Sequence, residues 1–371
     1  MWRVRGRDHA GMSLSGFGRA SVSSRSSRRL GSAVVTVLGG LAIVVIGATP
    51  ALAHVGGGGP APSNWQSPVT SVHPEMHGVV VRTLDNGDYV ELVNNSPVTV
   101  TVLGYDGEPY LRIGPDGVEA NTRSAATYLN RTADGRTTPP ADAGADTAPA
   151  WQHVDDQSRY HWHDHRAHWM LATPPPAVTT APDRAQQIAT WSVDMRYGSE
   201  PVTVTGTLSW VPGPSPWPWY GLAVGLALAA AAVGWLPQWR VPAGVAVLVL
   251  VAADVIDTLG GGLSGGSVVN LGVWVAGAWA VVALARRSAV APLLFGLTGT
   301  VVAVISGLGD VGVLSHSQVP FAGPAWLARL CVVTALGLGV GLLLTAWRLS
   351  RRERPAPLVV ATGDGATAPA G

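Results

Sequence analysis

The sequence predicts a two-part protein, an all-β domain with an Ig-like or cupredoxin-like sandwich followed by an α-helical membrane domain of five transmembrane helices. Short β-branched runs separated by Gly, Pro, Asn and Asp fill residues 54–211. Apolar stretches of bilayer length fill residues 219–347. The composition agrees, because 47% hydrophobic and 13% charged residues are more apolar and less charged than an ordinary soluble protein.

Charge and cysteine content exclude several classes of protein. All 24 basic residues are arginine, with abundant Ala, Gly, Val and Pro, as is typical of a GC-rich bacterial genome. The net charge is +1 and the arginines gather at the amino terminus and beside apolar segments, so no nucleic-acid partner is expected. The single cysteine, Cys331, excludes an intrachain disulfide and a CxxC motif.

Residues 1–53 have the organisation of a signal peptide. An Arg-rich region ends at Arg29, an apolar stretch covers 31–48, and Ala51-Leu52-Ala53 forms a small-residue cleavage site. Cleavage after Ala53 would leave His54 as the new amino terminus. An uncleaved anchor helix is the alternative.

The β-domain, residues 54–211, is expected to contain six or seven strands. The clearest are residues 79–84, 89–93, 98–103, 110–113, 189–195 and 202–210. Turns at 85–88 and 106–107 predict consecutive hairpins. The polar stretch 132–150 has no periodicity, which predicts a mobile loop.

A proline linker at 212–218 leads into the membrane domain. The predicted spans are residues 219–236, 241–259, 268–285, 290–308 and 325–347, followed by a disordered tail at 348–371. The loop arginines of this domain occur only in alternate loops, at Arg240, Arg286 and Arg287, and further arginines lie beyond the last span. By the positive-inside rule this predicts a multi-pass cell-membrane protein with the β-domain outside and the carboxy terminus in the cytoplasm.

The strongest candidate site is a histidine cluster. Eight of the ten histidines lie between His54 and His168, and the densest run holds His161, His163, His165 and His168. In a strand the first three would share a face, and in a helix the first, third and fourth would align. Neutral imidazole suits copper or zinc, and the thioether of Met170 would favour Cu(I). Asp164 would orient one imidazole.

A structural interpretation competes with metal binding. In it, Tyr160, Trp162 and Trp169 pack the domain while the histidines, Asp164 and Arg166 form a polar network or a pH-responsive patch.

Other histidines are secondary candidates. His54, if it becomes the amino terminus, offers its amine and ring as a chelating pair for copper. His73 and His77 flank Met76, but Pro74 makes a solvated loop the expected arrangement. His153 could join either group.

Four charged residues lie toward the outer side of the membrane domain. They are Asp254, Asp257, Asp310 and Arg329. Intramembrane charges need partners, so these residues either hold the bundle together as Asp–Arg pairs or line an ion pathway with His316 at its entrance. No G-x-S-x-G, H-E-x-x-H or phosphate-binding glycine loop occurs, and no enzyme activity is predicted.

Four segments carry a family resemblance. AHVGGGG follows the signal site, VLGYDGEPYLRIGPDGV covers 102–118, HWHDHRAHWM covers 161–170 and LSHSQVPFAGPAWLARL precedes and enters the last span. Together they resemble a family of uncharacterised bacterial exported multi-span membrane proteins. A looser similarity, in His54 and the architecture, is to copper-resistance proteins of the CopC and CopD type.

The sequence therefore predicts a membrane-anchored extracytoplasmic metal-binding protein for copper handling or resistance. Its expected partners are the lipid bilayer and an envelope protein or metal chaperone. The alternatives are an envelope interaction or assembly protein with structural histidines, and a small ion or metal transporter.

Overall fold

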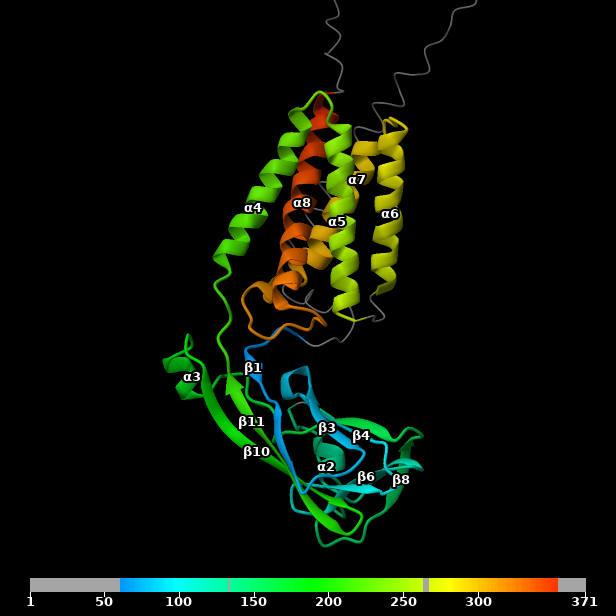
Figure 1. Cartoon of the computed structure of the whole chain (residues 1–371), viewed down its shortest axis with the longest axis vertical. Helices are drawn as coiled ribbons and strands as arrows, with labels where there is room; N and C mark the ends of the chain where they lie inside the picture. The colour runs from blue at the N-terminus through cyan, green and yellow to red at the C-terminus, as the bar shows by residue number, and fades with distance from the viewer. Residues whose placement is uncertain (1–60, 133, 263–266, 353–371) are drawn as a thin grey trace, which may run out of the picture. The chain divides into compact units, whose positions relative to one another are not determined.

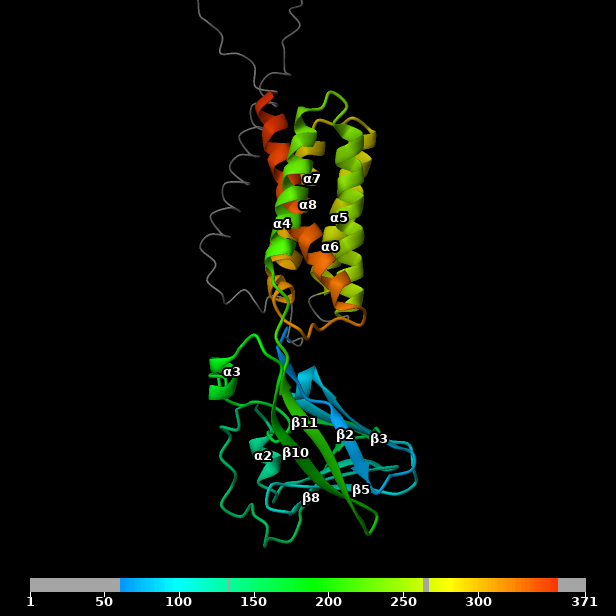
Figure 2. The same cartoon turned by 60° about the vertical axis from the view of Figure 1, so that its left-hand side comes forward.

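The computed structural model describes residues 61–132, 134–262 and 267–352 (Figures 1 and 2). The expected signal peptide, His54 and residues 353–371 of the tail lie outside this range. The predictions made for them stay predictions.

Residues 65–210 form an antiparallel β-sandwich, as predicted. The strands are β1 (Trp65–Gln66), β2 (Val69–His73), β3 (Val79–Leu84), β4 (Tyr89–Asn94), β5 (Val100–Leu103), β6 (Pro109–Gly114), β7 (Gly117–Asn121), β8 (Trp151–Asp155), β9 (Arg159–His163), β10 (Gln186–Tyr197) and β11 (Glu200–Trp210). Eight of them form one sheet, ordered β1-β11-β10-β5-β6-β7-β8 with β2 also paired to β11, and β3-β4-β9 form the other. The consecutive strands β8 and β9 thus lie at the edges of different sheets.

The hairpin between β3 and β4 follows the expected turn residues. Asp85 and Asn86 adopt φ values of 50° and 62°. Short Asp and Asn side chains tolerate this left-handed conformation better than most residues. Two short helices, α2 (Ala126–Leu129) and α3 (Pro176–Thr180), interrupt the longer loops.

The sandwich core is built on alternating residues of the long strands. Val193, Val204, Val100 and Val102 are fully buried. Trp191 stands opposite Gly206 on the neighbouring strand, where any Cβ would collide with its indole ring. The Trp191 Nε1 also donates to Ser67 Oγ at 2.8 Å. This hydrogen bond adds a polar contact to the apolar packing of the core.

Five helices follow that are long and apolar enough to cross a membrane, as predicted. They are α4 (Trp217–Ala232, continued by η3, Val233–Trp235), α5 (Arg240–Gly260), α6 (Ser267–Ala285), α7 (Ala291–Val302, continued by the π-helical η4, Ala303–Leu308) and α8 (Ala325–Arg352). A short 3-10 turn, η5 (Val311–Leu314), precedes α8.

Small residues bring the helix backbones close together. A Cβ at Gly339 of α8 would collide with the Gly299 backbone on α7, and one at Gly341 would collide with the Ala227 carbonyl on α4. Close backbone approach of this kind increases van der Waals contact where lipid offers no hydrophobic driving force.

Candidate functional site

The histidine run is neither one strand nor one helix. β9 ends at His163, and a turn follows in which the Ala167 amide donates to the Asp164 carbonyl at 2.9 Å. The prediction that a single element aligns three imidazoles is therefore wrong, because Asp164 ends the strand: its carboxylate accepts from the Arg166 amide at 3.2 Å.

The turn brings three imidazoles together by a different route. His165 lies 5.5 Å from His168 between ring centroids, with the rings nearly perpendicular, and His163 lies 6.4 Å from His168. We call His163, His165 and His168 the imidazole trio. His161 contacts Tyr89 at 5.3 Å and Tyr160 at 6.3 Å instead.

One nitrogen of each imidazole in the trio contacts a main-chain carbonyl. His163 Nδ1 lies 2.9 Å from the Asp88 oxygen, and His168 Nδ1 lies 3.1 Å from the Asp164 oxygen. His165 uses Nε2, which lies 3.0 Å from the Thr132 oxygen. Because a carbonyl can only accept, these ring nitrogens carry the protons, and in neutral rings the lone pairs are on His163 Nε2 and His165 Nδ1.

Met170 borders the same space as His165. A Cβ at Gly135, whose φ is +64°, would contact both the His165 ring and the Met170 methyl group. The Met170 side chain is 40% exposed, so its thioether is accessible. A soft ligand is thus available beside the trio.

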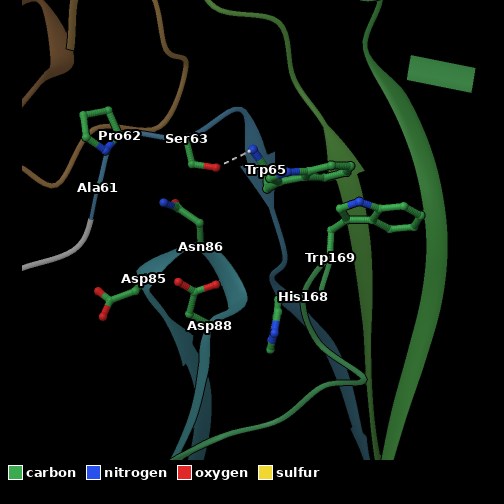
Figure 3. Close-up of a pocket in the computed structure, with 9 residues that line it drawn as sticks. All are labelled: Ala61, Pro62, Ser63, Trp65, Asp85, Asn86, Asp88, His168 and Trp169. Carbon is green, nitrogen blue, oxygen red and sulfur yellow. Dashed lines mark hydrogen bonds between the residues drawn. The ribbon is translucent and has the colours of Figure 1, made fainter. Parts of the chain in front are cut away.

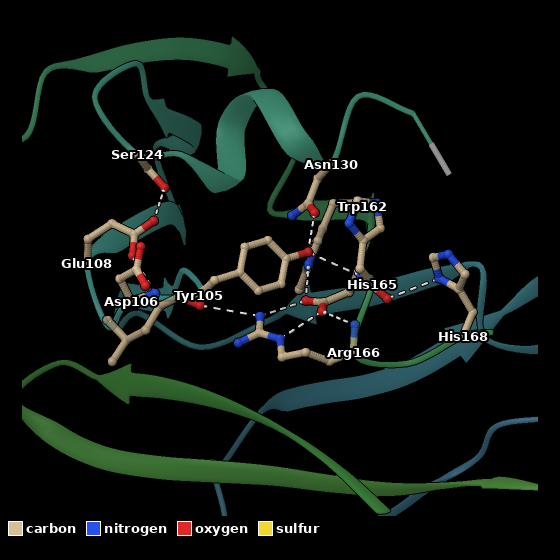
Figure 4. Close-up of polar contacts among 11 residues, drawn as sticks. Tyr105, Asp106, Glu108, Ser124, Asn130, Trp162, His165, Arg166 and His168 are labelled. Carbon is tan, nitrogen blue, oxygen red and sulfur yellow. Dashed lines mark hydrogen bonds and ion pairs between the residues drawn. The ribbon is translucent and has the colours of Figure 1, made fainter. Parts of the chain in front are cut away.

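The turn itself is fixed by a buried ion pair (Figure 4). The fully buried Asp164 accepts from Arg166 Nε and Nη2, each at 2.8 Å, and from the Trp162 indole at 3.0 Å. The expectation that its carboxylate orients an imidazole is not met, since His168 binds the Asp164 main-chain oxygen instead. Burial opposes the charge on Arg166, but the bonds to Asp164 still raise the pKa of the guanidinium.

Further contacts attach the turn to the sandwich. Ser67 Oγ donates to the Ala167 carbonyl at 2.5 Å, and Ser67 is the residue that Trp191 reaches from the core. The Tyr105 ring lies 4.9 Å under the Arg166 guanidinium. The packing part of the structural interpretation therefore holds, with Trp162 only 3% exposed.

A cavity of about 250 Å³ opens beside His168 (Figure 3). Asp85 and Asp88 line it opposite Trp65 and Trp169, whose rings stack at 5.8 Å. Burial, followed by the negative charge of Asp88, raises the pKa of the Asp85 carboxyl. The cavity gives cations an acidic approach to the trio.

Burial lowers the pKa of His163, and the neighbouring charges of His168 and His165 add to the effect. The Asp88 carbonyl and carboxylate oppose it. A neutral His163 is the form that can bind a metal ion.

The described part of the chain does not contain an assembled metal site. Among its residues, no three His, Cys, Asp or Glu side chains are arranged to hold one ion. The three imidazole rings of the trio are neighbours, but they are not arranged around one common point.

Two other predicted histidines, His153 and His316, have partners outside the trio. His153 pairs with Asp156 at 2.8 Å, and His316 Nδ1 lies 2.7 Å from the Gly312 carbonyl. Met76, between His73 and His77, is buried in the sandwich core and so is not an exposed ligand.

The intramembrane residues make different contacts from those expected. Asp254 is buried and accepts from the hydroxyl of Ser306 in η4 and from Trp274 Nε1, the latter at 2.7 Å. Arg329 donates to the carbonyls of Val313 and His316 at 3.1 and 2.9 Å. Within the described ranges it forms no ion pair with Asp254, Asp257 or Asp310, so the expected Asp–Arg pair is wrong.

Comparison with known proteins adds no relative: no family model, no curated protein and no solved structure matches this chain.

Proposed function

We propose that this chain is a membrane-anchored metal-binding protein that handles copper, with zinc as the alternative ion, outside the cytoplasm. The distribution of arginines between the loops supports an exported β-domain. The five apolar helices supply the anchor.

The observation that carries the proposal is the hydrogen bonding of the imidazole trio. Metal-ligating histidines almost always donate the second ring nitrogen to a carbonyl or carboxylate, which fixes the tautomer. His163, His165 and His168 each have one nitrogen on a main-chain oxygen. They are therefore the proposed ligands, with Met170 as an added ligand for Cu(I), and His161 is left out of the set.

Binding requires a small rearrangement, because the three side chains do not yet converge. Exposed side chains change rotamer in picoseconds to nanoseconds; His165 is partly exposed in the turn, whereas His168 is buried. Once bound, the ion would supply positive charge at the end of the cavity that Asp85 and Asp88 line. The expected role is capture or delivery of the ion without catalysis.

The test is equilibrium dialysis of the full chain in detergent, stripped of metal, against Cu(II) and Zn(II). We expect about one ion per chain, with affinity weakened at least about tenfold by His165→Gln and by His163→Gln. His153→Gln is the matched control, since it removes an exposed histidine paired elsewhere. Equal affinity in all four proteins would remove the trio from the proposal.

A second candidate, an envelope interaction protein with structural histidines, is favoured by one observation. Among the described residues the donor set is not preassembled, whereas the carbonyl contacts of the trio are complete. In that case the metal-stripped protein would bind no ion and its thermal stability would not respond to added Cu(II) or Zn(II).

A further inference from the structure

A second cavity, of about 400 Å³, opens between the two sheets. It lies where β8 and β9 separate, because these consecutive strands belong to the edges of different sheets. Tyr110 and Trp162 form its buried floor as a perpendicular ring pair, with centroids 6.4 Å apart. The size is within the range of small-molecule sites in proteins.

A buried amide donor in the wall of this cavity is left without a full hydrogen bond. Asn130 is 7% exposed and lines the cavity, and its Nδ2 makes no hydrogen bond. It interacts with the Tyr110 hydroxyl, but outside the geometry of a full hydrogen bond. Leaving such a group unsatisfied is unfavourable, so an acceptor supplied from outside would be favoured there.

The orientation of this amide follows from its neighbour Tyr105 (Figure 4). The Tyr105 hydroxyl oxygen accepts from the His165 amide at 3.2 Å, so its own proton is donated to Asn130 Oδ1. Because Oδ1 faces Tyr105, Nδ2 is the atom left for a ligand.

The charge of the lining indicates the chemistry of that ligand. Arg131 lines the cavity, held over the Tyr128 ring at 4.6 Å, and His161 also belongs to the lining. Among the described residues, no Asp or Glu lines the cavity. Tyr89, Tyr110, Tyr160 and Trp162 supply flat apolar walls.

We propose that the cavity between β8 and β9 binds a small aromatic carboxylate, whose ring lies among the tyrosines and whose carboxylate accepts from Asn130 Nδ2 and Arg131. The proposed ligand contacts, Asn130 and Arg131, do not belong to the imidazole trio, although His163 of the trio also lines the cavity. A failure of either proposal leaves the other in place.

The test uses 2-naphthoate as the anionic probe, with 2-naphthamide and 2-naphthylmethylammonium as its neutral and cationic counterparts. Binding to the metal-stripped full chain in detergent is followed by isothermal titration calorimetry. We expect 2-naphthoate to bind at least about tenfold more tightly than the cation, the difference that one charge-assisted hydrogen bond provides.

Two variants change the site without touching its buried amide. Arg131→Gln should weaken the affinity for 2-naphthoate about tenfold and leave the affinity for 2-naphthamide unchanged. Val154→Trp, at a position 42% exposed, should fill the mouth of the cavity and abolish binding of both compounds. Arg196→Gln, an exposed arginine on β10 outside the cavity, is the matched control. Absence of 2-naphthoate binding, equal affinity for the anion and the cation, or unchanged affinity in Arg131→Gln would overturn the proposal.

Discussion

Arg166 holds the carboxylate of Asp164 at both oxygens, with Nε and Nη2 each 2.8 Å away, although the two residues are only two positions apart. Asp164 is fully buried, whereas the Arg166 side chain is 22% exposed. The pair sets the turn that places His165 and His168, so it is the structural foundation of the proposed site.

Arg166→Met should lower the free energy of unfolding by about 3 kcal/mol, because it leaves the Asp164 carboxylate buried without its main partner. Chemical denaturation of the full chain measures this. Adding Asp164→Asn to Arg166→Met should recover much of the loss, since the uncompensated charge is gone. An additive double variant would show that the pair does not stabilise the turn.

His163 gives the domain a defined response to acid. Its pKa in the folded state lies below the ordinary value of 6.5, so the unfolded chain binds more protons as the pH falls. The contribution of neutral His163 to the free energy of unfolding is complete above about pH 6.5. It decreases below that pH until the folded ring also becomes charged. Thermal unfolding from about pH 7.5 to about pH 5.5 should be less pH-dependent in His163→Gln than in the parent protein, whereas an equal slope would contradict the assignment.

Met170 should affect which ion the site prefers more than whether the site binds an ion. A thioether favours Cu(I) over Zn(II), and leucine keeps the volume and the apolar character. We expect Met170→Leu to weaken the affinity for Cu(I) about tenfold, measured in competition with a Cu(I) chelator, and to leave the affinity for Zn(II) unchanged. If both ions are affected alike, Met170 contributes only to packing.

The membrane domain has its own test at Asp254, which accepts from Trp274 and Ser306. Asp254→Leu removes the acceptor for both donors and should destabilise the detergent-solubilised protein by about 1 to 2 kcal/mol. Asp254→Asn keeps one acceptor oxygen and should cost less. Thermal unfolding of the two variants compares them, and equal losses would mean that the hydrogen bonds are not what Asp254 contributes.

The sequence predicted those parts of the fold whose pattern is local. The run at β3 alternates along a half-buried strand, and the five helices are apolar over a bilayer length. β8 was missed, and β9 was left open between strand and helix, because histidine, glutamine and aspartate obscure the alternation. Their sheet positions depend on pairing with β7 and β4, which a single strand does not encode.

The candidate site was located by composition but not by geometry. The density of histidines indicated the segment that carries the proposed site, yet the strand-to-turn change at Asp164 was missed, although Asp after a β-run is a common turn residue. That change excludes His161 from the trio. The unpaired amide of Asn130 had no sequence signal at all, because it arises where α2 meets edges of two sheets.

The most direct test of the account is pulsed electron paramagnetic resonance of the full chain with about one equivalent of Cu(II), which detects the remote nitrogens of coordinated imidazoles. We predict modulation from more than one imidazole, reduced in His163→Gln, in His165→Gln and in His168→Gln, and unchanged in His153→Gln. A spectrum without imidazole modulation, or one that none of the three trio variants alters, would contradict the proposal that the imidazole trio holds the ion.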